Sequence, residues 1–131
     1  TTLFRSGNEF PEMILASCNW FQSVDKDSIF VNEGDHADEM ETSLMLHLHS
    51  DLVLPLKDAG SGKSKKFRVK ALNESWAWAE RKWTRVSEDT GIGNPSEATK
   101  AKGEEYFNLV CEKISGLIMD LDKVNRSNFY E

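Results

Sequence analysis

The stretch of sequence that decides the fold runs from residue 106 to residue 121 and reads YFNLVCEKISGLIMDL. Its apolar side chains recur at three- and four-residue spacing, which predicts an amphipathic helix with one buried face. Ser96 stands upstream at a position that suits a helix cap, so we expect a helix of about 25 residues to begin there. The residues expected on its buried face are Tyr106, Phe107, Val110, Ile114, Leu117, Ile118 and Leu121.

Shorter elements are predicted upstream of this helix. One helix is expected after a capping Asn8, continuing to Phe21, and another from Ala37 to about His49, each on apolar spacing typical of a helix. Helices that alternate with short strands favour an α/β layered fold. The remaining expectations are extended segments at residues 29–31, 51–56 and 82–86, a surface loop at 57–75, a turn at 90–95 and a frayed tail after Asn125.

Length and charge restrict the class of protein. The chain has 131 residues, 39% of them hydrophobic, and a net charge of −6, which predicts one globular domain and argues against a nucleic-acid partner. No apolar run approaches the ~20 residues that span a bilayer, so no membrane partner is expected. Cys18 and Cys111 stand in apolar contexts, and we interpret them as buried thiols of a cytoplasmic protein.

Residues 57–85 are a basic exception, with nine Lys or Arg against three acids. The sequence GSGKS at 60–64 resembles the end of a phosphate-binding loop, but Lys57 stands where the opening glycine is needed. We therefore interpret the basic side chains of this loop as a solvated face, with an anionic partner as the alternative. Trp76, Trp78 and Trp83 follow, and they are expected in a core or an interface, or else at a substrate mouth.

Residues 36–43, HADEMETS, form the densest cluster of reactive side chains. A helix that starts at Ala37 would bring one carboxylate close to the imidazole of His36. Such a pair suits divalent-metal binding or general acid–base chemistry. The alternative is an acidic first helical turn capped by Asp35.

Three ordered stretches together resemble the creatininase family, the creatinine amidohydrolases and their relatives. The first is HADEMETS with LML at 44–46 and DLV at 51–53. The second is AGSGK at 59–63 with WAWA at 76–79 and RKW at 81–83, which is similar to one subgroup of the family. The third is DTGIGNP at 89–95 with Ala98-Thr99 and Lys102-Gly103.

The resemblance implies a three-layer α/β/α domain with a pair of divalent metals, zinc or manganese. Such a pair activates a water for hydrolysis of a small cyclic or linear C–N amide. His36 matches the family's catalytic-pocket histidine, a general base or acid. Glu41 matches a glutamate that orients this histidine or completes the metal shell, and Glu39 is the other candidate metal ligand.

Two departures from the family pattern bear on this chain. Residues 4–8, FRSGN, align with the family's GHGGN, so Arg5 stands where a metal-binding histidine is expected, and a guanidinium cannot ligate a cation. The resemblance also places residues 1–131 in the C-terminal half of the family domain. We therefore expect the isolated chain to bind metal weakly or not at all and to be inactive.

A second hypothesis is a truncated or degenerate relative that acts as a subunit or interaction module without catalysis. A sheet that lacks its other strands would expose an apolar edge, so we expect a homo-oligomer or an aggregation-prone chain. The partner expected under the first hypothesis is a small amide substrate.

Overall fold

The computed structural model describes residues 2–125 and 128–130, and it contains two units. Unit 1 comprises the described parts of Thr1–Asp25 and Asn108–Glu131, and unit 2 comprises Lys26–Phe107. All residues of the predicted site except Arg5 belong to unit 2. The predicted frayed tail lies partly outside the described residues, since 126, 127 and 131 are not among them.

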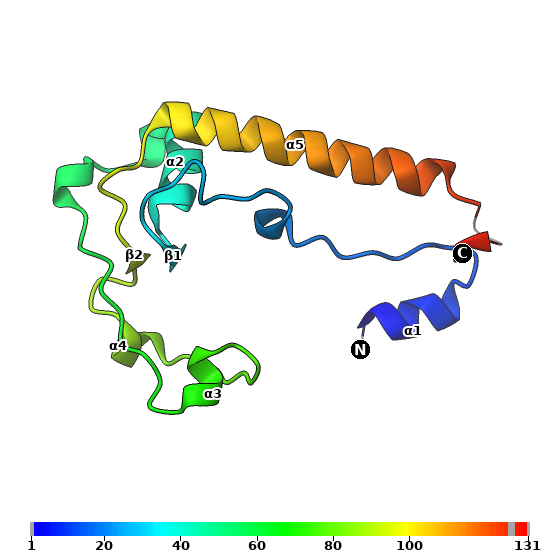
Figure 1. The fold of residues 1–131 in the computed structure, drawn as a ribbon, viewed down its shortest axis with the longest axis horizontal. Coiled ribbons are helices and arrows are strands. Elements are labelled where there is room, and N and C mark those ends of the chain that lie inside the picture. Colours follow the sequence, from blue (N-terminus) through cyan, green and yellow to red (C-terminus); the bar gives the residue numbers. More distant parts are fainter. Residues whose placement is uncertain (1, 126–127, 131) are drawn as a thin grey trace. The chain divides into compact units, whose positions relative to one another are not determined.

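The long helix predicted from the 106–121 stretch is confirmed as α5, Lys100–Lys123 (Figure 1). Its predicted start is wrong, because a turn closed by Ala98 N–H on the Pro95 carbonyl (2.9 Å) precedes it. Thr99 caps the helix instead, as its Oγ1 accepts the Lys102 N–H at 3.2 Å. A hydroxyl in this position satisfies one of the amides that a helix start leaves unpaired.

The apolar face of α5 is buried only over its first half. Tyr106 is fully buried, and Phe30 meets its ring edge to face with centroids 5.3 Å apart. Val110 is also buried, whereas Leu117 and Ile118 are exposed, the latter to 61%. The prediction that the whole stripe forms a core is therefore wrong for its C-terminal part.

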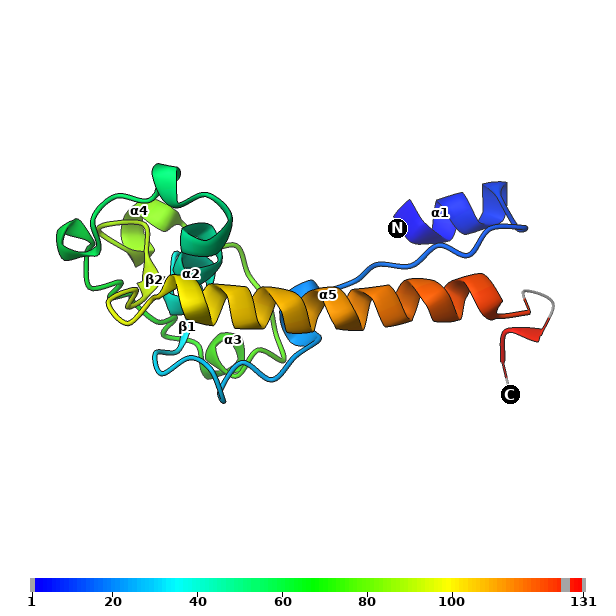
Figure 2. The ribbon, with the colours of Figure 1, turned by 90° about the horizontal axis from the view of Figure 1, so that it is seen from above.

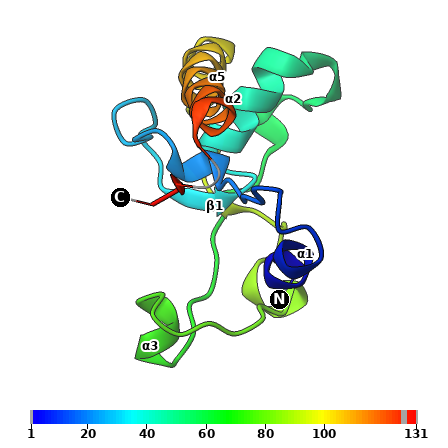
Figure 3. The ribbon, with the colours of Figure 1, turned by 90° about the vertical axis from the view of Figure 1, so that its right-hand side faces the viewer.

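The second predicted helix is confirmed as α2, Glu39–Leu48, which lies beside the first turns of α5 (Figures 1 and 3). Thr99 N–H donates to Ser43 Oγ at 3.2 Å, and Ser43 is fully buried. Gly103 permits this approach, because a Cβ there would overlap the Ser43 carbonyl oxygen.

This contact predicts that Gly103→Ala lowers the free energy of unfolding by about 1–3 kcal/mol, the usual cost of overpacking. Alanine is otherwise the better helix former by about 1 kcal/mol, so Gly116→Ala in the same helix, where a Cβ meets nothing within 4 Å, should raise stability. Urea denaturation of both variants measures the contrast. Equal effects with the same sign would contradict the close packing.

Strand β1, Gly34–His36, pairs antiparallel with β2, Ile92–Gly93, close to α2 and the first turns of α5 (Figure 2). This is the one sheet in the described part of the chain, so mixed helix and strand content is shown, whereas the three-layer α/β/α arrangement is not confirmed.

The predicted extended segments at 29–31 and 82–86 are wrong, and the one at 51–56 is wrong at its two ends but not at Val53, which has extended backbone. Phe30 N–H bonds locally to the Lys26 carbonyl at 2.9 Å. β-favouring residues form strands only where a neighbouring strand pairs with them, and within 2–125 and 128–130 none pairs with residues 29–31. The 3₁₀ helices η2 (Ser50–Leu52) and η3 (Leu56–Asp58) flank residues 53–55, and the short helix α4 (Trp83–Val86) replaces the predicted segment at 82–86.

The N-terminal prediction is also wrong, because helix α1 spans Thr2–Glu9 and not the residues after Asn8. Pro11 disfavours helical backbone at the residue before it, and the last helical hydrogen bond runs from Phe10 N–H to the Ser6 carbonyl at 2.8 Å. Beyond it the chain is irregular as far as η1, Trp20–Gln22. The predicted 57–75 loop is irregular apart from η3 and the four-residue helix α3, Lys70–Asn73.

Both cysteines are free and exposed, so the prediction of buried thiols is wrong. Cys18 lies in an irregular segment, and Cys111 is one residue beyond Val110, about 100° round the helix from the buried position. Over residues 2–125 and 128–130, no helix combines the length and apolar character needed to cross a bilayer.

Candidate functional site

The candidate site is built on the junction between β1 and α2. Ala37 takes a left-handed backbone conformation there, with φ of 49°, which costs a non-glycine residue about 1–2 kcal/mol. Asp38, and not the predicted Asp35, caps α2: its Oδ1 accepts the Glu41 N–H at 2.9 Å. Asp38 is almost fully buried, which fixes the direction in which α2 leaves the strand.

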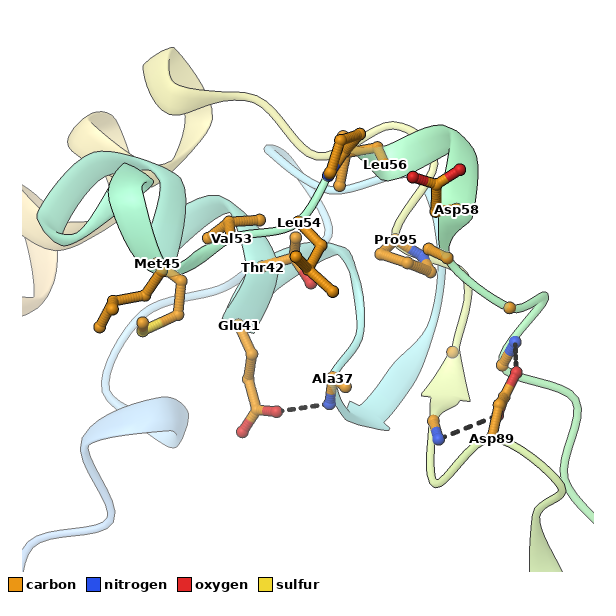
Figure 4. Close-up of a pocket in the computed structure, with 17 residues that line it drawn as sticks. Ala37, Glu41, Thr42, Met45, Val53, Leu54, Leu56, Asp58, Asp89 and Pro95 are labelled. Atoms are coloured by element: carbon orange, nitrogen blue, oxygen red, sulfur yellow. Dashed lines mark hydrogen bonds between the residues drawn. The ribbon is translucent and has the colours of Figure 1, made fainter.

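Glu41 lies between this cap and His36. Its Oε2 accepts the Ala37 N–H at 2.6 Å and lies 3.8 Å from His36 Nδ1 (Figure 4 shows the first contact). The longer distance is an ion-pair distance for a protonated histidine and not a hydrogen bond. The structure thus brings together the two predicted catalytic residues, with both side chains half-exposed.

Aromatic and charged side chains from distant parts of unit 2 hold His36. Its ring lies 4.9 Å from the Trp83 ring, centroid to centroid. Arg81 lies over the same indole, with Cζ 4.9 Å from the centroid, and it bonds Asp35 Oδ2 at 2.7 Å. Cation–π contacts of this kind contribute about 0.5–1 kcal/mol at exposed sites. The sequence prediction missed Trp83 and Arg81 as supports of the site, although both belong to the matching stretch 81–83.

Glu39 occupies a different environment from Glu41. It is fully buried: Oε1 accepts from Lys102 Nζ at 2.6 Å, and Oε2 accepts from the Val31 and Asn32 amides and the Asn32 side chain. Burial by itself would raise the pKa of Glu39, but the hydrogen bonds from Lys102 and Asn32 outweigh it and hold the pKa below its ordinary value. Both carboxylate oxygens are therefore engaged in joining α2 to α5 and to the preceding loop.

A groove of about 590 Å³ adjoins Glu41. Its wall is largely apolar, with Met45, Val53 and Leu54 near Glu41, while Asp89 lies at the other end beside β2 (Figure 4). A groove of this size is typical of small-molecule sites.

The Asp89 carboxylate holds the glycine-containing residues 60–62, which belong to the loop predicted at 57–75. It accepts from Ser87 Oγ, Gly91 N and Gly62 N, and the Ser87 bond is the main reason that its pKa is lowered. Gly62, with φ of 61°, packs so closely on Gly93 that a Cβ would overlap the Gly93 carbonyl oxygen. The glycines of 60–62 thus serve close backbone packing.

The described residues do not fit a divalent-metal centre. Among them, no three His, Cys, Asp or Glu side chains converge to hold an ion. Glu39 does not join His36 and Glu41, since both of its oxygens are engaged by other donors. Arg5 is exposed in unit 1, and its guanidinium cannot ligate a cation. The ring of His47, another histidine of α2, packs on Phe107 with ring centroids 5.5 Å apart.

Comparison with known proteins identifies the family. Residues 5–118 match the model of the creatininase family, creatinine amidohydrolase. Among solved structures, the chain is similar to a protein from Bacteroides fragilis NCTC 9343 that is provisionally named a creatinine amidohydrolase, with 40% identity and a TM-score of 0.87. The match covers 98% of this chain and 50% of that protein, so the chain spans half of its length. No curated protein matches. The family match covers most of the sequence and includes the His36–Glu41 junction, and the chain therefore belongs to the creatininase family.

Proposed function

We propose that this chain supplies the acid–base pair of an amidohydrolase that cleaves a small C–N amide. The observation that carries the proposal is the approach of His36 Nδ1 to Glu41 Oε2, at 3.8 Å, beside a groove of small-molecule size. Family membership supports hydrolase chemistry for this pair.

The geometry suggests a division of labour within the pair. Since Nδ1 is the nitrogen near Glu41, Nε2 is free to face a substrate. His36 Nε2 would first accept a proton from the water that attacks the carbonyl carbon of the amide. It would then deliver that proton to the leaving nitrogen as the C–N bond breaks. The Glu41 carboxylate would stabilise the imidazolium between these two steps, and the Ala37 amide fixes its position.

Zinc or manganese, which family membership suggests, would need ligands beyond those that the described residues bring together. Metal-ligand roles for Glu41 and Glu39 remain predictions, and no step above depends on them. The cytoplasmic location likewise remains a prediction.

We therefore expect the purified 131-residue chain, after dialysis, to retain zinc or manganese weakly and at well under one ion per chain. Trace-metal analysis measures the content. The same sample should hydrolyse neither creatinine nor formamide when either metal is added. Two tightly held ions per chain, or robust hydrolysis, would contradict the reading of Arg5 and of the engaged Glu39.

The second candidate function is a non-catalytic subunit or interaction module. The observation that favours it is the exposure of large apolar side chains in unit 2, including Trp76 at 75% and Leu54 at 80%. Apolar residues left in water in this number favour a protein partner or self-association. Light scattering after size-exclusion chromatography tests it, since a monomer at every concentration would count against a homo-oligomer.

A further inference from the structure

A second cavity in unit 2, of about 610 Å³, lies apart from the groove beside Glu41 and has a different lining. Loop residues 64–67, the region from α3 to residue 79, and α4 surround it. Four cations line this cavity, Lys65, Lys66, Arg81 and Arg85, against one carboxylate, that of Asp35.

The one carboxylate does not neutralise the set. Asp35 bonds Arg81 at 2.7 Å, so its charge is already matched. Lys65, Lys66 and Arg85 form no ion pair with any described side chain. Three exposed cations on one cavity give it a net positive potential, which favours an anionic ligand.

Backbone pairing brings these cations together. Lys65 N–H donates to the Val86 carbonyl at 2.8 Å, and Ser64 pairs with Ser87 in an antiparallel bridge. These contacts place the lysine-bearing loop against the C-terminal end of α4 and the extended residue Ser87 that follows it, next to Arg85. The backbone pairing therefore keeps Lys65 close to Arg85.

The remaining wall offers flat surfaces. Two hydrogen bonds join Asn73 to the backbone of Phe67: Asn73 Oδ1 accepts the Phe67 N–H at 3.0 Å, and Asn73 Nδ2 donates to the Phe67 carbonyl at 2.7 Å. Trp78 also lines the cavity and is 87% exposed, so its indole face is open to a ligand. An indole beside cations suits a ligand in which a planar ring is joined to an anionic group.

We propose that this cavity binds a small phosphate ester with a planar ring, the phosphate held by Arg85, Lys65 and Lys66 and the ring stacked on Trp78. A guanidinium matches phosphate oxygens with two parallel hydrogen bonds, and ammonium groups add point charge. The volume suits a small molecule and not a polymer groove. Neither His36 nor Glu41 lines this cavity, so binding there does not use the proposed acid–base pair, although Asp35 and Arg81, which support His36, form part of its wall.

Titration calorimetry of the full chain in 0.15 M salt, with inorganic phosphate, adenosine and adenosine 5′-monophosphate as probes, tests the proposal. We expect the monophosphate to bind more tightly than either fragment. Arg85→Gln should weaken its binding by about 10-fold or more, the usual effect of losing a charge-assisted hydrogen bond, and Arg85→Lys should recover part of the loss. Trp78→Ala should weaken the monophosphate and leave inorganic phosphate unchanged.

Arg68→Gln is the matched control, since Arg68 belongs to the same basic stretch but does not line the cavity. It should change affinity by less than about 2-fold, because exposed charges at a distance are screened at this salt concentration. Equal losses for Arg68→Gln and Arg85→Gln, no binding of the monophosphate, or tighter binding of a short oligonucleotide would overturn the proposal. Far-UV circular dichroism of each variant confirms that a loss of binding is not a loss of fold.

Discussion

Replacing Lys102 by methionine is expected to lower the free energy of unfolding by about 3–5 kcal/mol, the usual cost of removing one partner of a buried ion pair. Glu39 is fully buried, and Lys102 Nζ lies 2.6 Å from its Oε1. Without the ammonium group, the carboxylate keeps the donors of Val31 and Asn32 but loses its counter-charge. Urea denaturation at neutral pH measures the change.

Lys100→Met is the matched control, because Lys100 is exposed on the same helix and forms no ion pair with a described residue. It should change stability by less than about 0.5 kcal/mol, as surface substitutions usually do. The double variant Glu39→Gln/Lys102→Met should recover much of the loss, since no unpaired charge is then buried. If Lys102→Met costs no more than Lys100→Met, the structural role of the pair is refuted.

The pair also gives a pH dependence with a definite sign. The pKa of Glu39 is lower in the folded chain than its ordinary value of 4.5. The carboxylate therefore contributes stability above pH 4.5, and this contribution is lost as the pH falls through the lower folded pKa. In Lys102→Met this acid-dependent contribution should shrink.

Local pattern predicted the two helices that frame the site, because each has an apolar repeat long enough to signal helix by itself. It failed where the outcome depends on distant partners. Residues 29–31 have strand propensity but no pairing strand among the described residues, and Trp83–Val86 forms a turn of helix for the same reason. Ser96 has the chemistry of a cap, but Pro95 starts a turn that moves the cap to Thr99.

In the candidate functional site, too, local contacts could be predicted from the sequence and contacts between distant residues could not. The His36–Glu41 approach follows from five-residue spacing across a loop-to-helix junction, so the sequence could indicate it. The contact between His36 and Trp83 and the bond between Glu39 and Lys102 join residues far apart in the chain. Neither contact has a local signature, because each depends on how loops and helices meet in three dimensions.

The largest effect on activity is expected for His36→Ala in a protein of full family length. A suitable protein is a chimera in which residues 1–131, carrying Arg5→His to restore the expected metal-binding histidine, replace the matching half of the Bacteroides fragilis protein. A positioned general acid–base group contributes about 10²–10⁴-fold to the chemical step, so turnover should fall by that factor. KM should change little, because the imidazole acts on the proton in transit and contributes little to ground-state binding.

His49→Ala is the control, since His49 is exposed at the C-terminal end of α2, remote in sequence from the cap. Glu41→Gln should lower turnover by less than His36→Ala does, as it removes the charge that stabilises the imidazolium but keeps the ring.

The most direct test of the proposed acid–base role is therefore kcat for creatinine and formamide in the chimera, measured for the parent, His36→Ala and His49→Ala. The proposal predicts a loss of about 10²–10⁴-fold for His36→Ala alone, with His49→Ala near the parent value. Full turnover in His36→Ala, or an equal loss in His49→Ala, would contradict it.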